Sequence, residues 1–353
     1  MNHNEIYDVT IIGGGPAGLF STFYSGMRAM KTKLIDFQPQ LGGKVNVYPE
    51  KIIWDIGALT PVTGEKLMEQ MIEQASTFDP EIVLNEKIIK VEKPSEEQLF
   101  ILTAANGNKH ISKTVILAVG GGILKPIKLN MQGADRFEVT NLHYVIQSLN
   151  KFKNKDVMIL GGGNAAIDWA VELEPVAKSV KIVHRRDQFD CHESQLTHVK
   201  KSTIQIHSES TVKQLVSTQD NTKINSVLVK NNKTGKSSQI KVDDVIISYG
   251  FERELSFIKD SPLDIELIND YFINGTAKSQ TSIDGLFAAG DILAFDGKVH
   301  LIAGAFTDAT NAVNQAKHYL DPSSTATGRV SSHNSRFEEK NKKIRSHLYV
   351  NNS

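Results

Sequence analysis

The chain has 353 residues, 40% of them hydrophobic, and this length and composition predict two domains with buried cores. Lysine plus arginine number 40 and so do aspartate plus glutamate, so net charge gives no attraction to nucleic acid or to membranes. The single cysteine, Cys191, excludes an intramolecular disulfide and a cysteine-rich metal site, and is typical of the reducing cytoplasm.

The N-terminus leads into a predicted strand without the basic and apolar regions of a signal peptide. No uninterrupted apolar stretch approaches the roughly 20 residues that cross a bilayer. We therefore expect a soluble, cytoplasmic protein without a metal site and without a nucleic-acid or membrane partner.

A glycine-rich loop follows the first predicted strand, in the sequence VTIIGGGPAGLF. Gly13 permits the tight turn, Gly15 admits a pyrophosphate to the backbone, and Gly18 lets the next helix pack closely. The N-terminus of that helix then points at the anion. The next predicted strand ends at Asp36, 23 residues after Gly13, where a carboxylate binds a ribose hydroxyl. The alternative is a glycine-rich turn that binds nothing.

A second glycine-rich loop follows the predicted strand DVMIL. Its fingerprint residues are Gly161, Gly163 and Ala166, and alanine is accepted at the third position. The next strand ends at His184, 23 residues after Gly161, and Arg185 and Arg186 follow. Because guanidinium groups bind a 2′-phosphate and an acid would repel it, this loop is predicted to prefer NADP(H). The alternative is a pair of solvated arginines at a strand end.

Two further predicted strands, at residues 114–122 and 242–252, end in glycine and bracket the second loop, which marks them as domain borders. After the second border, the sequence SIDGLFAAGD places Asp291 at the end of a strand, directly after Gly290. A carboxylate there can accept a hydrogen bond from a polyol hydroxyl, such as the ribitol of a flavin.

The order of GGGPAG, Asp36, GGGNAAID, HRRDQF and GLFAAGD resembles the pyridine nucleotide-disulfide oxidoreductase superfamily over nearly the whole chain. The resemblance implies an α/β fold of two Rossmann-like three-layer domains. An NADP(H)-binding domain, residues 120–249, is inserted into an FAD-binding domain formed by residues 1–119 and 250–353. The flavin contacts implied by the first loop and the GD motif are Gly13, Gly15, Ala17, Gly18, Asp36 and Asp291.

Thioredoxin reductase is the most similar branch in length and layout, and it carries a Cys-x-x-Cys pair just upstream of its second loop. The corresponding stretch here, NLHYVIQSLNKFKNKD, has no cysteine. Thiol exchange requires a dithiol, so electrons must leave the flavin by another route. The chain resembles instead the thioredoxin-reductase-like, type 2 ferredoxin-NADP(+) reductases of bacteria.

This second resemblance implies further flavin contacts. They are Lys44, Tyr48, Ile89, Leu124 and Ser332, with the Tyr48 ring stacking on the isoalloxazine. The alternatives are simple strand packing for Ile89 and Leu124 and a surface position for Tyr48.

The chain continues from about residue 321 as a polar, serine-rich extension, the composition of a disordered tail. The resemblance implies instead that the extension crosses a homodimer and covers the flavin with a stacking side chain. His333 is the candidate for that side chain. Counting back from Phe337 places Ser332 at the same position, and a solvated histidine is the remaining alternative.

The expected function is that of an oxidoreductase, a flavoprotein that passes hydride from NADPH to flavin N5 and then single electrons to ferredoxin or flavodoxin. No side chain is needed as a general acid or base. The helix beginning near Gly304 would direct its positive N-terminus at the flavin. The alternatives are an NADPH-dependent flavin oxidase or monooxygenase, a disulfide reductase using Cys191 with a small thiol, and a non-enzymatic redox sensor.

Overall fold

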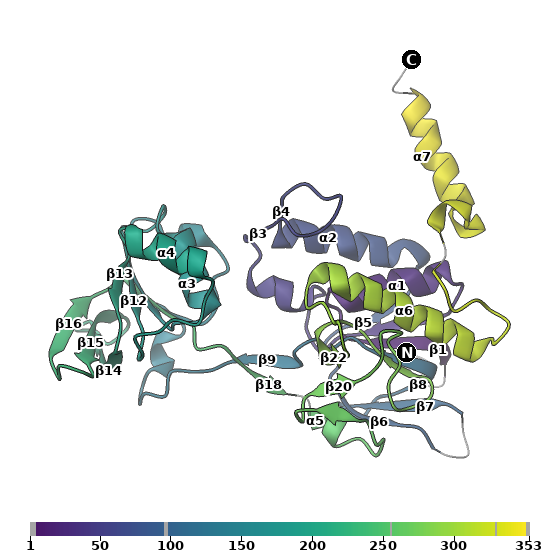
Figure 1. The fold of residues 1–353 in the computed structure, drawn as a ribbon, viewed down its shortest axis with the longest axis horizontal. Helices are drawn as coiled ribbons and strands as arrows, with labels where there is room; N and C mark the ends of the chain where they lie inside the picture. The colour runs from purple at the N-terminus through teal and green to yellow at the C-terminus, as the bar shows by residue number, and fades with distance from the viewer. Residues whose placement is uncertain (1–4, 95–97, 255, 329, 351–353) are drawn as a thin grey trace. The chain divides into compact units, whose positions relative to one another are not determined.

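The computed structural model describes residues 5–94, 98–254, 256–328 and 330–350, except for the side chains of residues 123, 124, 253, 254, 256 and 347–350. The chain divides into two compact units, coloured along the sequence in Figure 1. The first unit consists of Met1–Asn46, Lys51–Ile123 and Glu254–Ser353, and the second of Val47–Glu50 and Leu124–Arg253.

The first unit contains a seven-stranded sheet made of β1 (Ile6–Ile12), β2 (Thr32–Ile35), β5 (Glu81–Val83), β6 (Ile88–Glu92), β7 (Phe100–Ala104), β8 (Lys109–Leu117) and β21 (Leu286–Ala288). The strands β5, β2, β1 and β8 are parallel and adjacent in that order, and β21 is parallel to β8. The antiparallel strands β7 and β6 continue the sheet beyond β8. Every residue of β2 is buried, as expected for a parallel strand covered on both faces.

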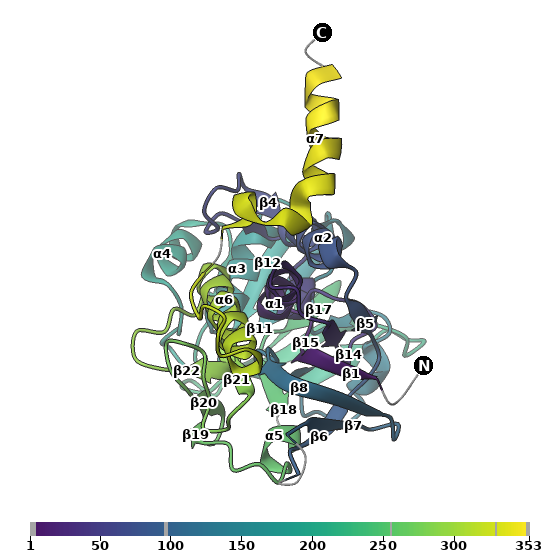
Figure 2. The same ribbon diagram turned by 90° about the vertical axis from the view of Figure 1, so that its right-hand side faces the viewer.

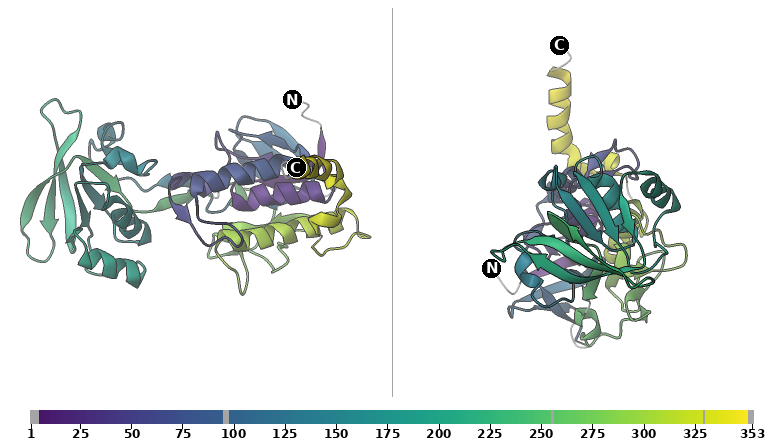
Figure 3. Two further views of the ribbon diagram at one scale, coloured as in Figure 1. Left: turned by 90° about the horizontal axis from the view of Figure 1, so that it is seen from above. Right: turned by 90° about the vertical axis from the view of Figure 1, so that its left-hand side faces the viewer.

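Three helices run side by side along this sheet, α1 (Pro16–Met27), α2 (Gly64–Ala75) and α6 (Ile302–Leu320), as Figure 3 shows from above. Proline at the first position starts α1, and α2 begins where the Thr63 hydroxyl accepts the Lys66 N–H at 3.2 Å. The smaller elements of this unit are α5 (Ser256–Lys259), β3 (Ile52–Ile53), β4 (Val62–Thr63), β19 (Leu267–Ile268), β20 (Phe272–Asn274), β22 (Leu293–Ala294), η1 (Gly43–Val47), η2 (Ser76–Phe78) and η5 (Gly290–Ile292).

The second unit has a five-stranded parallel sheet in the order β10 (Leu142–His143), β17 (Asp244–Ile247), β11 (Asp156–Leu160), β12 (Ser179–Val183), β13 (Gln205–His207). Its remaining elements are α3 (Asn164–Leu173), α4 (Glu193–Lys201), the antiparallel β14 (Ser210–Ser217), β15 (Ile224–Asn231) and β16 (Ser237–Lys241), η3 (Asp135–Phe137) and η4 (Leu149–Phe152). The paired strands β9 (Ile123–Pro126) and β18 (Phe251–Glu254) lie where the chain passes between the units.

The parallel strands of the two sheets share one arrangement. The central strand is β1 or β11, the next two strands of the sheet along the chain extend to one side, and a later strand, β8 or β17, pairs on the other side. In the second sheet β10 lies at the edge beyond β17. The strand order therefore reverses beside β1 and beside β11, and in such sheets ligands bind at the carboxyl ends of the strands next to the reversal. This arrangement confirms the predicted α/β fold class.

The C-terminal extension is ordered over the residues that the structure describes, although its composition is that of a disordered tail. Its elements are η6 (Ser331–His333), η7 (Ser335–Phe337) and α7 (Glu338–Val350). The Arg28 guanidinium donates to the Thr325 carbonyl at 2.8 Å, and the Asn334 amide donates to the Met27 carbonyl at the same distance. The Phe337 ring packs against other rings of this unit, and α7 then extends away from the sheet (Figure 2).

Within the described residues, no helix combines the length and the apolar character that crossing a membrane requires. The longest one, α6, has 19 residues and carries Asp308 and Lys317.

Candidate functional site

The first glycine-rich loop connects β1 to α1. A side chain at Gly13, whose φ is +106°, would lie 2.4 Å from the carbonyl oxygen of Ala118, the residue after β8. A Cβ at Gly18 would lie 1.7 Å from the Gly13 carbonyl oxygen. A Cβ at Gly15 would meet only the Cα of Gly43, at 3.8 Å. The packing of the loop thus requires Gly13 and Gly18, while Gly15 leaves the backbone open to a ligand.

The N-terminus of α1 is suited to a phosphate group. Gly15 is its N-cap, no side chain caps it, and its first turn contains no acidic residue. The first N–H groups of a helix have no partner within the helix and carry its partial positive charge. These features fit the pyrophosphate of a dinucleotide.

Asp36 follows β2 and lies beneath this loop. Its two carboxylate oxygens accept the N–H groups of Gly14 at 2.5 Å and of Gln38 at 2.8 Å. Burial raises the pKa of Asp36, and these backbone donors oppose the rise. Each oxygen keeps a further lone pair, so the carboxylate can still accept a ribose hydroxyl.

The GD motif forms η5, at the end of β21. Gly290 has φ of +78°, and a Cβ there would lie 2.9 Å from the Cβ of Ala17 in α1. The turn therefore packs on the first turn of α1 and places Asp291 beside the glycine-rich loop. The Asp291 side chain is 52% exposed, and its carboxylate lies 3.9 Å from His300 Nδ1.

Helix α6 begins at Ile302, two residues before the expected Gly304, and no side chain caps it. It packs along α1 (Figure 3). The N-termini of both helices, Asp36 and Asp291 thus gather at the carboxyl edge of the first unit's sheet.

The remaining predicted flavin contacts are more dispersed. Lys44 is exposed in η1, which adjoins the first loop because the Gly42 N–H donates to the Gly14 carbonyl at 2.8 Å. Tyr48 is half-buried in a segment that groups with the second unit. The side chain of Leu124 is outside the described residues.

Ile89 and the extension lie away from the first loop of their own chain. Ile89 is 40% exposed on β6, at the edge of the sheet and three strands from β1. Ser332 and His333 are exposed in η6, next to the residue that binds the Met27 carbonyl. Since α1 has 12 residues and rises about 1.5 Å per residue, its Met27 end is about 18 Å from its Gly15 end.

The second glycine-rich loop connects β11 to α3. A Cβ at Gly161 would lie 2.4 Å from the carbonyl oxygen of Ser248, the residue after β17. Gly163 is the N-cap of α3, no side chain caps that helix, and a Cβ there would meet only the Asp190 carbonyl oxygen, at 3.9 Å. Ala166 is fully buried against the strand. The backbone of this loop is therefore open to an anion at Gly163, as that of the first loop is at Gly15.

His184 packs its ring against this second loop. A Cβ at Gly162 would lie 2.3 Å from the ring, which is 7% exposed. Burial, assisted by the positive charges of Arg186 and Arg185, lowers the pKa of His184. The position that Asp36 has relative to the first loop is therefore occupied, at the second loop, by a neutral, packed ring.

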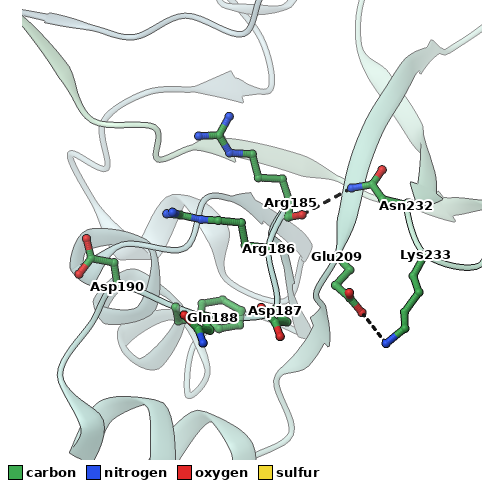
Figure 4. Close-up of a pocket in the computed structure, with 9 residues that line it drawn as sticks. Arg185, Arg186, Asp187, Gln188, Asp190, Glu209, Asn232 and Lys233 are labelled. Carbon is green, nitrogen blue, oxygen red and sulfur yellow. Dashed lines mark hydrogen bonds and ion pairs between the residues drawn. The ribbon is translucent and has the colours of Figure 1, made fainter.

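Arg185 and Arg186 are exposed and line an open hollow of about 650 Å³. Figure 4 shows both side chains extending in the same direction from the strand end. The other lining residues are Asp187, Gln188, Phe189, Asp190, Glu209, Asn232 and Lys233.

Sequence reasoning missed the opposite wall of this hollow. The Asn232 amide donates to the Arg185 carbonyl at 3.5 Å, and Lys233 lies 3.9 Å from the Glu209 carboxylate, away from the arginines (Figure 4). Both residues belong to the turn between β15 and β16. The sequence NNKTG indicates such a turn, but not what it packs beside.

Cys191 is half-buried and free. Burial and the nearby charges of Asp168 and Asp190 raise the pKa of its thiol. A raised pKa disfavours the thiolate, which is the nucleophile in thiol exchange. Among the described residues, no group of three or more histidine, cysteine or acidic side chains could hold a metal ion.

Comparisons with known proteins agree with this architecture. The profile of the pyridine nucleotide-disulphide oxidoreductase family matches residues 7–316. Ferredoxin–NADP reductase 1 of Bacillus thuringiensis (strain Al Hakam) is 52% identical over 98% of each chain, and its namesake from Lysinibacillus sphaericus is 53% identical over the same shares.

Among solved structures, thioredoxin reductase of Lactococcus lactis in its FR conformation is 26% identical. It superposes with a TM-score of 0.74 and covers 89% of this chain and 99% of its own. The motif order, both sheet topologies and these similarities over most of the sequence lead to one conclusion: the chain belongs to the pyridine nucleotide-disulphide oxidoreductase family, in its ferredoxin–NADP reductase branch.

Proposed function

We propose that the protein passes electrons between NADPH and ferredoxin or flavodoxin, with FAD and NADP(H) as its cofactors. The observation that carries this proposal is the 52% identity, over 98% of both chains, to a relative named ferredoxin–NADP reductase. Cys191 supports the proposal in two ways. It is the single cysteine of the sequence, so the chain has no dithiol for a disulfide substrate, and its raised pKa disfavours the reactive thiolate.

The residues of the first loop would hold FAD. The pyrophosphate would lie at the N-terminus of α1, against the open backbone of Gly15, with the adenosine ribose on Asp36 and the ribitol on Asp291. When bound, FAD accepts a hydride from NADPH and releases electrons singly, which suits a one-electron carrier. The uncapped N-terminus of α6 would stabilise negative charge on the flavin ring.

The second loop would hold NADP(H). The pyrophosphate would lie at the N-terminus of α3, beside Gly163. Arg185 and Arg186 would bind the 2′-phosphate from the hollow that they line. His184 occupies the position where an acid would repel that phosphate. Because its pKa is lowered, the ring is neutral and can stay buried against the loop.

We assign the stacking groups of the flavin ring to Tyr48 on one side and to the extension of a partner subunit on the other. We infer a partner because η6 is attached at the Met27 end of α1, far from the chain's own first loop. In a homodimer, His333 or Ser332 of one subunit would serve the flavin of the other. Ile89 lies three strands from β1 and stays a weaker candidate for contact with FAD.

The decisive experiment is steady-state NADPH oxidation with cytochrome c as final acceptor, with and without ferredoxin. Reduction of cytochrome c should depend on ferredoxin and should survive a thiol-blocking reagent. Rapid NADPH consumption with oxygen alone would favour the oxidase alternative. Inhibition by the thiol reagent would favour the single-cysteine disulfide reductase.

Two truncations separate docking from chemistry. Residues 336–348 contain Arg336, Lys340, Lys342, Lys343 and Arg345 against Glu338 and Glu339, a positive excess suited to an acidic carrier. Ending the chain at Phe337 removes α7 and keeps the packed part of the extension, whereas ending it at Leu320 removes both. Both variants should keep FAD and reduce ferricyanide with NADPH, and both should lose most ferredoxin-dependent activity and salt sensitivity. Ferredoxin reduction at the full rate, at low and high salt, would exclude a docking role.

A further inference from the structure

A buried ion pair lies beneath the GD motif. The side chains of Lys298 and Asp308 are 4% and 5% exposed and contact each other directly. The same Asp308 oxygen, Oδ2, accepts the N–H of Gly290 at 3.0 Å. Lys298 belongs to the loop between β22 and α6, Asp308 to the second turn of α6, and Gly290 to η5. One oxygen atom therefore connects three separate segments.

The stability of the fold does not explain this pair. Removing two charges from water costs several kcal/mol per ion, and apolar residues of similar size commonly stabilise a protein as well or better. The backbone around the pair is already held, because the Ser279 hydroxyl donates to the Asp308 carbonyl at 2.9 Å and the Ala289 N–H to the Leu117 carbonyl at the same distance. What the ion pair adds is a fixed relation between the GD turn and the loop that leads into α6.

Those two segments carry the chain's groups for the flavin. Asp291 directly follows Gly290, and Gly290 rests on Ala17 in the first turn of α1. The loop that contains Lys298 ends at Leu301, the N-cap of α6. A small shift of this loop relative to the turn would change the distance between Asp291 and the N-terminus of α6.

We propose that Lys298 and Asp308 are a positioning pair for the flavin site, which sets the spacing between Asp291 and the N-terminus of α6. Both side chains are buried, so they act through the Gly290 N–H and through the loop. The inference rests on the proposed FAD site and adds two residues that no glycine-rich or acidic motif contains.

The test is the double variant Lys298→Met/Asp308→Asn, which keeps the side-chain volumes and an acceptor for Gly290 and leaves no buried charge. The FAD dissociation constant, measured by fluorescence on the reconstituted apoprotein, should rise at least about tenfold, the range of one charge-assisted hydrogen bond. The midpoint potential of the bound flavin should become more negative, because the N-terminus of α6 would be less well placed. The melting temperature of the apoprotein should change little.

Matched variants separate the possible outcomes. Lys33→Met removes another buried lysine of the same unit, which pairs with the partly exposed Glu81 at 3.3 Å, and should leave FAD affinity and potential unchanged. Asp291→Ala should purify largely without FAD. If the double variant binds FAD within about twofold of the unaltered protein while Asp291→Ala does not bind it, the positioning role is wrong and the FAD site stands.

If Asp291→Ala also keeps its FAD, the site assignment itself is wrong. Asp308→Asn alone provides the same comparison if the double variant does not fold, because the neutral amide keeps an acceptor for the Gly290 N–H and removes the ion pair with Lys298. An unchanged FAD affinity in that single variant would equally overturn the proposal.

Discussion

The two glycine-rich loops are constrained alike at their first glycine and differ at the residue that follows the next strand. In both, a Cβ on the first glycine would lie 2.4 Å from the carbonyl oxygen of the residue after the neighbouring strand. The middle glycine, Gly14 or Gly162, faces Asp36 in one loop and the His184 ring in the other. One loop therefore has a carboxylate beneath it, and the other has the His184 ring at the same place with two guanidinium groups following it in the chain.

The turn and the side chains proposed to select the nucleotide are therefore separate parts of each loop region. The first glycine of each turn is required by the same steric contact, and each turn leads to an uncapped helix N-terminus suited to a pyrophosphate. In the proposed assignment, the choice of nucleotide depends on side chains 23 to 25 residues after the first glycine of each loop. Three sets of variants test how far this separation holds.

The largest effect is expected at the third position of each fingerprint. Gly18→Ala would place a Cβ 1.7 Å from the Gly13 carbonyl oxygen, so the loop must move. We expect the loss of FAD and a destabilisation of more than about 3 kcal/mol. Ala166→Gly removes one buried methyl group and should cost only about 1 to 2 kcal/mol. Flavin absorbance and chemical denaturation measure both effects.

If Gly18→Ala and Ala166→Gly lowered the free energy of unfolding by the same amount, the two loops would be held by the same packing. Retention of FAD by Gly18→Ala would show that α1 can move away from β1, and would remove the steric argument for the first loop.

The next effect concerns coenzyme choice. Replacing Arg185 and Arg186 together by alanine should raise KM for NADPH at least about tenfold and leave KM for NADH nearly unchanged, because charge-assisted hydrogen bonds to the 2′-phosphate contribute about 1.5 to 3 kcal/mol each. Lys233→Ala is the matched control, since this cation lines the same hollow but turns toward Glu209. Equal losses with NADPH and NADH would mean that the arginines support the fold instead.

The smallest effect is a difference in pH dependence. His184 has a lowered pKa, so the unfolded chain binds its proton more readily and the residue's contribution to stability is lost as pH falls below about 6.5. Asp36 has a raised pKa, so its contribution is present in acid and is lost as pH rises above about 3.9. The two slopes have opposite signs.

Urea unfolding between pH 4 and 8 gives the free energy of unfolding of the apoprotein and of the variants His184→Gln and Asp36→Asn. The unfolding free energy of the unaltered apoprotein minus that of His184→Gln should rise with pH. The same difference taken with Asp36→Asn should fall with pH. Slopes of the same sign would contradict the burial of one of the two residues.

The parts of the site that sequence could predict are those built from neighbouring residues. A strand, a glycine turn and a helix follow one another in the chain, so the positions of Gly13, Gly161 and the acid or histidine after the next strand follow from local spacing. Asp291 was predicted in the same way, from the strand that precedes it. The helix expected near Gly304 begins two residues earlier, at Ile302.

The parts that could not be predicted join segments far apart in the chain. The Lys298 and Asp308 pair meets Gly290 across a loop, and Asn232 reaches the carbonyl of Arg185, 47 residues away. The attachment of the extension through Arg28 depends on a carbonyl 297 residues later. Such contacts follow from tertiary packing, which leaves no periodic pattern in the sequence.

Helix α1 serves different purposes at its two ends. Its first turn faces the glycine-rich loop, while its last turn, through the Met27 carbonyl and the ring of Phe23, holds the C-terminal extension. The interior of the helix is buried and separates these functions by its whole length. The extension is thus a modular attachment: evolution or protein engineering can lengthen, recharge or replace it without altering the loop that faces the cofactor.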